Sequence, residues 1–382
     1  MFYNRAINIK KGITMKKLTT VLLVLLLSFA LFAQGGKELQ TQTTTTGDNV
    51  TMRLLTDATG IDDKSFNAAA WRGILSFYND ENQVRRGTDY DVVTAQSQDQ
   101  YIPNIRQAAE GGYDLICTTG FTFADALIET APQYPDQNFC IIDVDWVQQP
   151  NVMEFIFSEE EGSYLVGLAA AYQAQKDGIQ NPKFGFIGGV PGSTITKFEM
   201  GYIQGVKAVY PYAEIVDYYA NDWGKPELAK AQAKNWYDNG VYCIFSAAGG
   251  TGGGTIAQAK EYRSQGKNVW AIGVDSDQYA DGLYAEGKSA VLTSMIKKVE
   301  LATEMALNDC QAGTFKGGVI RLGLKDGGVG YSKANAELSD DVKAKIDSVA
   351  KDIAEGKFVI FGTYAETKAA GIAPANLGAI DD

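Results

Sequence analysis

The sequence contains no histidine, and this absence excludes several functions at once. Histidine-based catalytic triads, histidine general bases and histidine-ligated metal sites all need that side chain. Four cysteines are present, and none stands in a Cys-x-x-Cys pair, so neither a zinc site nor a thioredoxin-like site is indicated. Three of them, Cys117, Cys140 and Cys243, lie in apolar strand-like runs typical of buried thiols. A disulfide between Cys117 and Cys140 stays an open alternative, because they lie in successive expected strands.

Positive charge is also scarce. Lys and Arg number 34 against 46 Asp and Glu, which gives a net charge of −12. Proteins that bind nucleic acids or anionic membranes are usually basic, so we expect neither partner. At 382 residues, the chain is long enough for two or three domains with a large core.

The first long apolar run belongs to a segment typical of exported proteins. Residues 15–33 (MKKLTTVLLVLLLSFALFA) have a basic start, an apolar run and a small residue at the end, which predicts a secretory signal peptide. We expect Met15 to be the true start, residues 1–33 to be removed, and the threonine-rich residues 34–49 to form a flexible linker. The alternative is an uncleaved membrane anchor, although the run is short for a transmembrane span.

From Val50 onward, strand-like and helix-like segments alternate, which predicts parallel strands covered by helices. The expected strands are 51–55, 89–95, 114–118, 138–143, 183–187, 214–219, 241–246, 269–274 and 289–294. The expected helices are 64–79, 101–111, 123–132, 158–176, 195–209, 226–239, 254–265, 278–286 and 296–311. The helix over 158–176 has acids in its first turn, as the helix dipole favours.

Because the alternation restarts after residue 176, the sequence predicts an α/β protein of two doubly wound, parallel-sheet lobes. We expect the first lobe to comprise 50–155 plus 296–335, and the second 156–295 plus 336–382. The expected strands end in polar or glycine residues, and in doubly wound sheets these ends form the ligand-binding edge. One cleft between the lobes is therefore expected.

Three aspartates, Asp57, Asp143 and Asp275, each follow an apolar strand at this edge. A carboxylate accepts several hydrogen bonds and suits the hydroxyl groups of a sugar. The alternative for each is a structural role in capping the next helix. Nothing in the sequence marks one as a nucleophile or as an acid of raised pKa, so we expect binding rather than catalysis.

Aromatic, amide and glycine residues stand at equivalent loops. Phe66, Phe198 and Trp223 offer flat faces for a base, with ordinary core packing as the alternative. Asn67 can both donate to and accept from a base edge, or can simply face water at a helix start. Gly249 opens the run GGTGGG, which lacks the Gly-Lys-Ser/Thr ending of a phosphate loop and indicates a close backbone approach to a ligand.

Several motifs together resemble the basic membrane protein family of substrate-binding proteins, of the purine nucleoside receptor (PnrA-like) type. They are the turn IDDKSFN at 61–67, the run GGVPGSTITKFEMGY at 188–202, AAGG at 247–250, IGVD at 272–275 and the Ser-Met-x-Lys segment that ends at Lys297. The resemblance covers roughly residues 50–330. It implies a type I periplasmic-binding-protein fold with a hinge, an aromatic sandwich around a purine, and Asp275 with Lys297 at the ribose.

On this basis we expect an exported substrate-binding protein of an ABC importer. It would be a monomer without a cofactor, with a purine nucleoside as ligand and an ABC permease as partner. The family's usual lipobox cysteine is absent at Phe32-Ala33-Gln34-Gly35, so we expect no lipid anchor and a soluble protein, periplasmic or secreted. The alternatives are a sugar or another small polar ligand on the same fold, a nucleoside hydrolase, and a receptor that signals instead of feeding a transporter.

Overall fold

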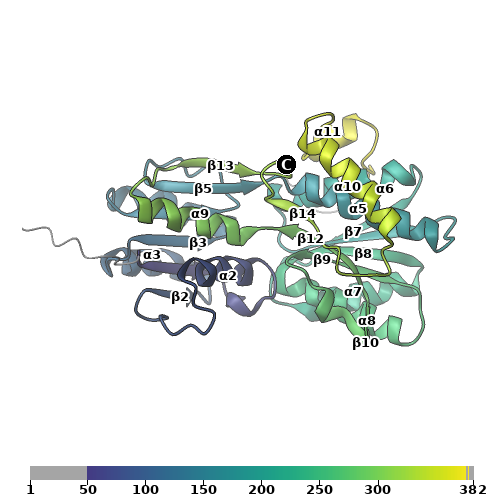
Figure 1. Cartoon of the computed structure of the whole chain (residues 1–382), viewed down its shortest axis with the longest axis horizontal. Coiled ribbons are helices and arrows are strands. Elements are labelled where there is room, and N and C mark those ends of the chain that lie inside the picture. Colours follow the sequence, from purple (N-terminus) through teal and green to yellow (C-terminus); the bar gives the residue numbers. More distant parts are fainter. Residues whose placement is uncertain (1–49, 376, 378–382) are drawn as a thin grey trace, which may run out of the picture. The chain divides into compact units, whose positions relative to one another are not determined.

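The computed structural model describes residues 50–375 and residue 377, so the expected signal peptide and linker lie outside the described residues. The described part contains two six-stranded sheets, each with helices on both faces (Figure 1). This architecture confirms the expected α/β fold with two doubly wound lobes. None of its helices has both the length and the apolar content needed to cross a membrane.

The first sheet has the strand order β13-β5-β4-β3-β1-β2, and all its neighbouring strands are parallel. Its strands are β1 (Met52–Thr56), β2 (Tyr90–Thr94), β3 (Leu115–Thr119), β4 (Asn138–Ile142), β5 (Val152–Phe157) and β13 (Gly318–Leu322). One face is covered by α2 (Phe66–Tyr78) and α9 (Val299–Ala312), and the other by α3 (Tyr101–Glu110) and α4 (Ala124–Thr130). Cys117 and Cys140 are partners in the β3–β4 register, and both are free thiols.

The second sheet has the order β14-β12-β9-β8-β6-β7 and is parallel except for β14. Its strands are β6 (Lys183–Gly188), β7 (Glu214–Tyr219), β8 (Val241–Ala247), β9 (Trp270–Asp275), β12 (Val291–Lys297) and β14 (Val329–Tyr331). The helices α5 (Glu159–Lys176) and α6 (Ser193–Val209) cover one face, and α7 (Pro226–Asp238) and α8 (Gly253–Ser264) the other. The tail adds α10 (Asp340–Ala354), which packs on α5, and α11 (Tyr364–Ala369), which touches α6.

The chain passes from one lobe to the other three times. It crosses between β5 and α5, between β12 and α9, and between β13 and β14. The two lobes are therefore built from discontinuous segments.

Two expectations about the later part of the chain are wrong. Residues 278–286 do not form a helix: a short 3-10 turn (Tyr279–Gly282) leads into the hairpin of β10 (Leu283–Ala285) and β11 (Lys288–Ser289). Gly287 turns this hairpin with a positive φ of 64°, and the flanking residues pair across two antiparallel strands instead of within a helix. The strand β14, expected in the first lobe with residues 296–335, instead pairs with β12 in the second sheet. A strand of three residues carries too little periodicity to be found in the sequence.

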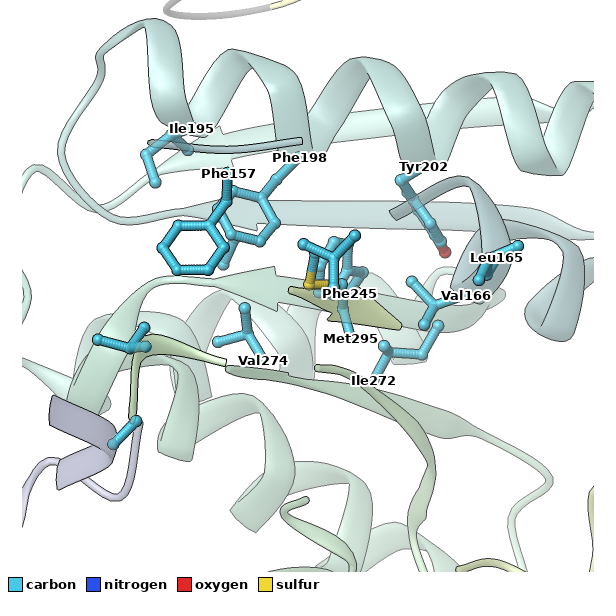
Figure 2. Packing of buried hydrophobic residues seen from close by; sticks show 14 of the residues in the cluster. Phe157, Leu165, Val166, Ile195, Phe198, Tyr202, Phe245, Ile272, Val274 and Met295 are labelled. Atoms are coloured by element: carbon cyan, nitrogen blue, oxygen red, sulfur yellow. The ribbon is translucent and has the colours of Figure 1, made fainter. Parts of the chain in front are cut away.

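The core of the second lobe lies between α5, α6 and the sheet, and Figure 2 shows its centre. The ring of Phe245 lies 5.4 Å from that of Tyr202 and 6.2 Å from that of Phe198. Phe198 is only 3% exposed, so it belongs to this core as well as to the loop edge. Because Phe198 lies on the core side of α6, packing in this core fixes the position of its ring at the cavity.

The helices α5 and α6 approach each other through glycines. A Cβ atom added at Gly205 would lie 2.2 Å from the backbone oxygen of Tyr164, and one at Gly167 would lie 2.5 Å from that of Tyr202. Backbone atoms cannot give way as a flexible side chain does. Glycine is therefore required at this helix contact because of the close packing.

We predict that Gly205→Ala lowers the free energy of unfolding by about 1–3 kcal/mol, because the new methyl group forces α5 and α6 apart. Urea unfolding followed by circular dichroism measures this. Gly253→Ala is the matched control, since Gly253 is also helical and a Cβ there meets no atom within 4 Å. The control should be neutral or stabilising by up to about 1 kcal/mol. Equal destabilisation by both variants would contradict the packing argument.

Candidate ligand-binding site

A cavity with about 620 Å³ of empty space lies at the carboxyl ends of strands from both sheets. All nine residues singled out in the sequence line it: Asp57, Phe66, Asn67, Asp143, Phe198, Trp223, Gly249, Asp275 and Lys297. Eleven further residues also line it: Thr59, Asp63, Thr119, Gly120, Phe121, Thr122, Thr194, Ile195, Ala247, Ala248 and Val274.

Asp57 and Asn67 form one polar wall with Thr59. The Asp57 carboxylate accepts hydrogen bonds from the backbone N–H of Thr59 at 3.1 Å, from the Thr59 hydroxyl, and from Nδ2 of Asn67 at 3.0 Å. Nδ2 of Asn67 also donates to the Thr59 hydroxyl at 2.9 Å. Both amide protons are thus used within the protein. The wall presents oxygen acceptors to the cavity.

The helix α2 is capped by Asp63, which the sequence analysis did not single out. Its carboxylate accepts the backbone N–H groups of Ser65, Asn67 and Ala68 at 2.9–3.0 Å. Asp57 therefore does not carry the capping role that was its structural alternative. An acidic residue just before the helical pattern was the available signal for Asp63.

Asp143 and Asp275 occupy equivalent places in the two lobes. Asp143 directly follows β4 and Asp275 is the last residue of β9, and both have a positive φ, 70° for Asp143 and 63° for Asp275. Aspartate tolerates this left-handed region better than most residues, and such strained positions cluster at binding sites. The Asp275 carboxylate accepts a hydrogen bond from the Ser65 hydroxyl across the cavity edge. Burial raises the pKa of Asp275 to about 7, although Lys297 and Ser65 oppose the shift.

Lys297 lies at the end of β12 and is only 1% exposed. Its ammonium donates to both carboxylate oxygens of Asp143, at 2.6 and 2.7 Å, and forms an ion pair with Glu159 Oε1 at 2.9 Å. Burial opposes its charge, but Asp143 and Glu159 hold the pKa of Lys297 above its usual value. Glu159 was missed as a site residue, because its place in the first turn of α5 already had a helix-dipole explanation.

Aromatic rings come to the cavity from both lobes. Phe66 begins α2 in the first lobe, whereas Phe198 lies in α6 and Trp223 in the β7–α7 loop of the second. Phe121, another missed residue, meets Trp223 edge to face with ring centroids 6.2 Å apart. Its signal was its place just after the expected strand over 114–118. Trp223 needs glycine at position 189, where a Cβ would lie 2.0 Å from its ring.

The glycine-rich run after β8 supports the Trp223 loop. The Thr251 N–H donates to the Trp223 carbonyl at 2.8 Å, and the Thr251 hydroxyl donates to the Asp222 carbonyl at 2.8 Å. Gly249 has a positive φ of 54° and lines the cavity next to this contact. The run therefore packs its backbone against the Trp223 loop at the cavity, and its approach to a ligand stays a prediction.

Within residues 50–375 and 377, no three acidic or cysteine side chains are grouped so that they could hold a metal ion. The cavity instead offers aromatic faces, hydrogen-bond acceptors and one ammonium group already paired with carboxylates. This combination suits an uncharged ligand that has a flat part and several hydrogen-bond donors.

Comparison with known proteins agrees with the motifs. A family model described as "ABC transporter substrate-binding protein PnrA-like" matches residues 51–360. A relative from Listeria monocytogenes, named a CD4+ T-cell-stimulating antigen, is 39% identical over 314 residues, covering 80% of this chain and 86% of the relative. A relative from Lactococcus lactis subsp. cremoris, named an ABC transporter nucleoside-binding protein, BmpA, is 36% identical over 318 residues, covering 80% and 88%.

A solved structure shows the same fold. It is an ABC transporter solute-binding protein from Aeropyrum pernix, with a TM-score of 0.73 and 27% identity. The match covers 84% of this chain and 98% of that protein.

The raised pKa of Asp275 predicts a pH-dependent stability. Between the pKa of an aspartate in the unfolded chain, about 4, and the folded value of about 7, the folded protein holds a proton that unfolding releases. Rising pH therefore favours unfolding across this window. We predict that wild type loses stability relative to Asp275→Asn as pH rises from 4 to 7, by on the order of a few kcal/mol.

Urea unfolding of both proteins across this pH range measures the difference. Asp277→Asn is the control, because Asp277 lies two positions further along the chain on an exposed turn. The difference in free energy of unfolding between wild type and Asp277→Asn should not show this fall as pH rises from 4 to 7. A constant difference between wild type and Asp275→Asn would contradict the predicted protonation.

Proposed function

Because this chain belongs to the PnrA-like family of ABC transporter substrate-binding proteins, we propose that its cavity binds a purine nucleoside for uptake. The observation that carries the proposal is the pairing, in one cavity, of aromatic rings with carboxylates on both lobes. A purine stacks on aromatic faces, and ribose hydroxyls donate to carboxylates. The name of the Lactococcus relative, a nucleoside-binding protein, supports the same ligand class.

The charge of the cavity supports a nucleoside over a nucleotide. Four aspartates line it, Asp57, Asp63, Asp143 and Asp275, against a single lysine. That lysine is already paired with two carboxylates, so no free positive charge is left for a phosphate. A free nucleoside carries no charge and avoids this repulsion.

Binding by hinge closure is part of the proposal. The ligand would contact Phe66 on one lobe and Phe198 and Trp223 on the other, so the closed arrangement gains contacts that an open one lacks. Polar contacts between the lobes border the same region. Lys64 Nζ pairs with Asp281 at 2.7 Å, and an Arg72 nitrogen donates to the Ser276 hydroxyl at 2.7 Å.

We place the protein outside the cytoplasmic membrane, where it would deliver the nucleoside to an ABC permease without chemical change. The expected signal peptide at residues 1–33 and the substrate-binding family support this. Within the cavity, Asp57 accepts hydrogen bonds from Thr59 and Asn67, and Asp143 accepts hydrogen bonds from Lys297, which suits stable binding rather than proton transfer.

The first experiment is ligand identification on the purified protein. Mass spectrometry of what is released on unfolding is followed by calorimetric titration with adenosine, guanosine, inosine, uridine and ribose. We expect tight binding of at least one purine nucleoside and no free base after hours of incubation. Binding of ribose alone would favour a sugar-binding protein, and release of free base would favour a hydrolase. Either result would overturn the proposal.

We predict that Phe66→Ala weakens purine nucleoside binding by about tenfold to a hundredfold, because one stacking face is lost. Calorimetry measures the change in Kd, and circular dichroism checks that the fold is intact. Tyr212→Ala is the control, since Tyr212 is an aromatic residue with a 98% exposed side chain and lies outside the cavity. Unchanged affinity in Phe66→Ala would exclude Phe66 from the site.

A further inference from the structure

The buried ammonium of Lys297 is surrounded by carboxylate oxygens. A lysine carries three N–H donors. The structure places three carboxylate oxygens around Nζ: two of Asp143 at 2.6 and 2.7 Å, and one of Glu159 at 2.9 Å. The remaining surroundings are the rings of Phe66, Phe157 and Phe198, whose centroids lie 5.1–5.3 Å away. Figure 2 shows Phe157 and Phe198 beside each other in this region.

Glu159 reaches Lys297 from outside the cavity lining. It is the first residue of α5, at the point where the chain crosses from the first lobe to the second, and it is 1% exposed. Its Oε1 contacts Lys297, and its Oε2 faces Lys197 Nζ at 3.5 Å. Burial opposes its ionisation, but Lys297 and Lys197 hold the pKa of Glu159 below its usual value. Glu159 therefore stays an anion beside the cavity.

The consequence is a cavity end that repels anions. Without Glu159, one ammonium would face one carboxylate, Asp143, and the pair would be neutral. With Glu159, two carboxylates share that ammonium, and Asp275 adds a third acidic side chain to the lining. Lys197 offsets part of this charge, but it is 21% exposed and does not line the cavity.

We propose that Glu159 is a positioning and specificity-determining residue: by occupying the third donor of Lys297 beside Asp143, it makes this end of the cavity accept hydrogen bonds only and selects uncharged or cationic ligands over anionic ones. The inference rests on the proposed nucleoside function and names the feature that keeps anionic derivatives out. Glu159 acts through Lys297 and Asp143, and does not itself touch the ligand.

The test uses ligands that differ in charge with little change in size. Adenosine, its 5′-amino-5′-deoxy analogue and its 5′-carboxylate analogue are titrated into wild type and Glu159→Gln. The glutamine keeps the shape and one acceptor oxygen but removes the charge. We expect wild type to prefer the amine over the carboxylate, and Glu159→Gln to shift this preference towards the carboxylate by at least about tenfold.

Two variants control the result. Glu161→Gln removes a charge from the same helix turn, but Glu161 accepts the Leu324 N–H at 2.7 Å and does not line the cavity, so the preference should not change. Lys197→Gln removes the cation that faces Glu159, and the preference should move the opposite way, towards the amine. This second variant keeps the proposal testable if Glu159→Gln does not fold.

A measurement without ligand separates this inference from the proposed function. Burial raises the pKa of Asp143, and the Glu159 charge adds to the rise against the opposing effect of Lys297. A ¹³C NMR titration of the Asp143 carboxyl carbon should therefore show a lower pKa in Glu159→Gln and no change in Glu161→Gln. The inference requires that both the analogue preference and this titration respond to Glu159→Gln, and it is overturned if either one does not respond. If wild type binds no nucleoside, the proposed function fails, and the titration still decides the role of Glu159.

Discussion

The buried ammonium of Lys297 is the constraint on which the rest of the site depends. Removing a charge from water costs several kcal/mol unless partners compensate it, and here Asp143 and Glu159 do so. Asp143 follows β4 in the first lobe, Lys297 ends β12 and Glu159 begins α5. Lys297 and Glu159 therefore each lie at a point where the chain crosses between the lobes. The cluster ties β12 of the second lobe to the end of β4 in the first lobe and to the start of α5.

Close backbone approach is the second requirement, and glycine supplies it at two places. Gly167 and Gly205 let α5 and α6 touch, which sets the position of Phe198 on the buried face of α6. Gly189 leaves room for the Trp223 ring, which Thr251 anchors from the glycine-rich run. Two of the aromatic faces of the cavity, Phe198 and Trp223, are thus positioned by glycines of the second lobe.

Much of the fold and of the cavity could be predicted from the sequence, because parallel strands place their carboxyl ends at one edge. That rule was enough to select Asp57, Asp143 and Asp275 from forty-six acidic residues, and all three line the cavity. The hairpin over 283–289 and the strand β14 could not be predicted in this way. They are short, and their pairing depends on partners distant in the chain rather than on local periodicity.

The sequence by itself determined the α/β alternation, the absence of histidine chemistry and the residue types at the strand ends, since each of these is local or compositional. Only the tertiary structure decided what those residues bond to. Glu159 looked like a helix-dipole residue and is a buried counter-ion of Lys297, Lys297 is paired with Asp143, and Phe121 is a partner of Trp223. The physical reason is that hydrogen bonds, charges and ring contacts between residues more than a hundred positions apart are set by packing, which no local pattern records.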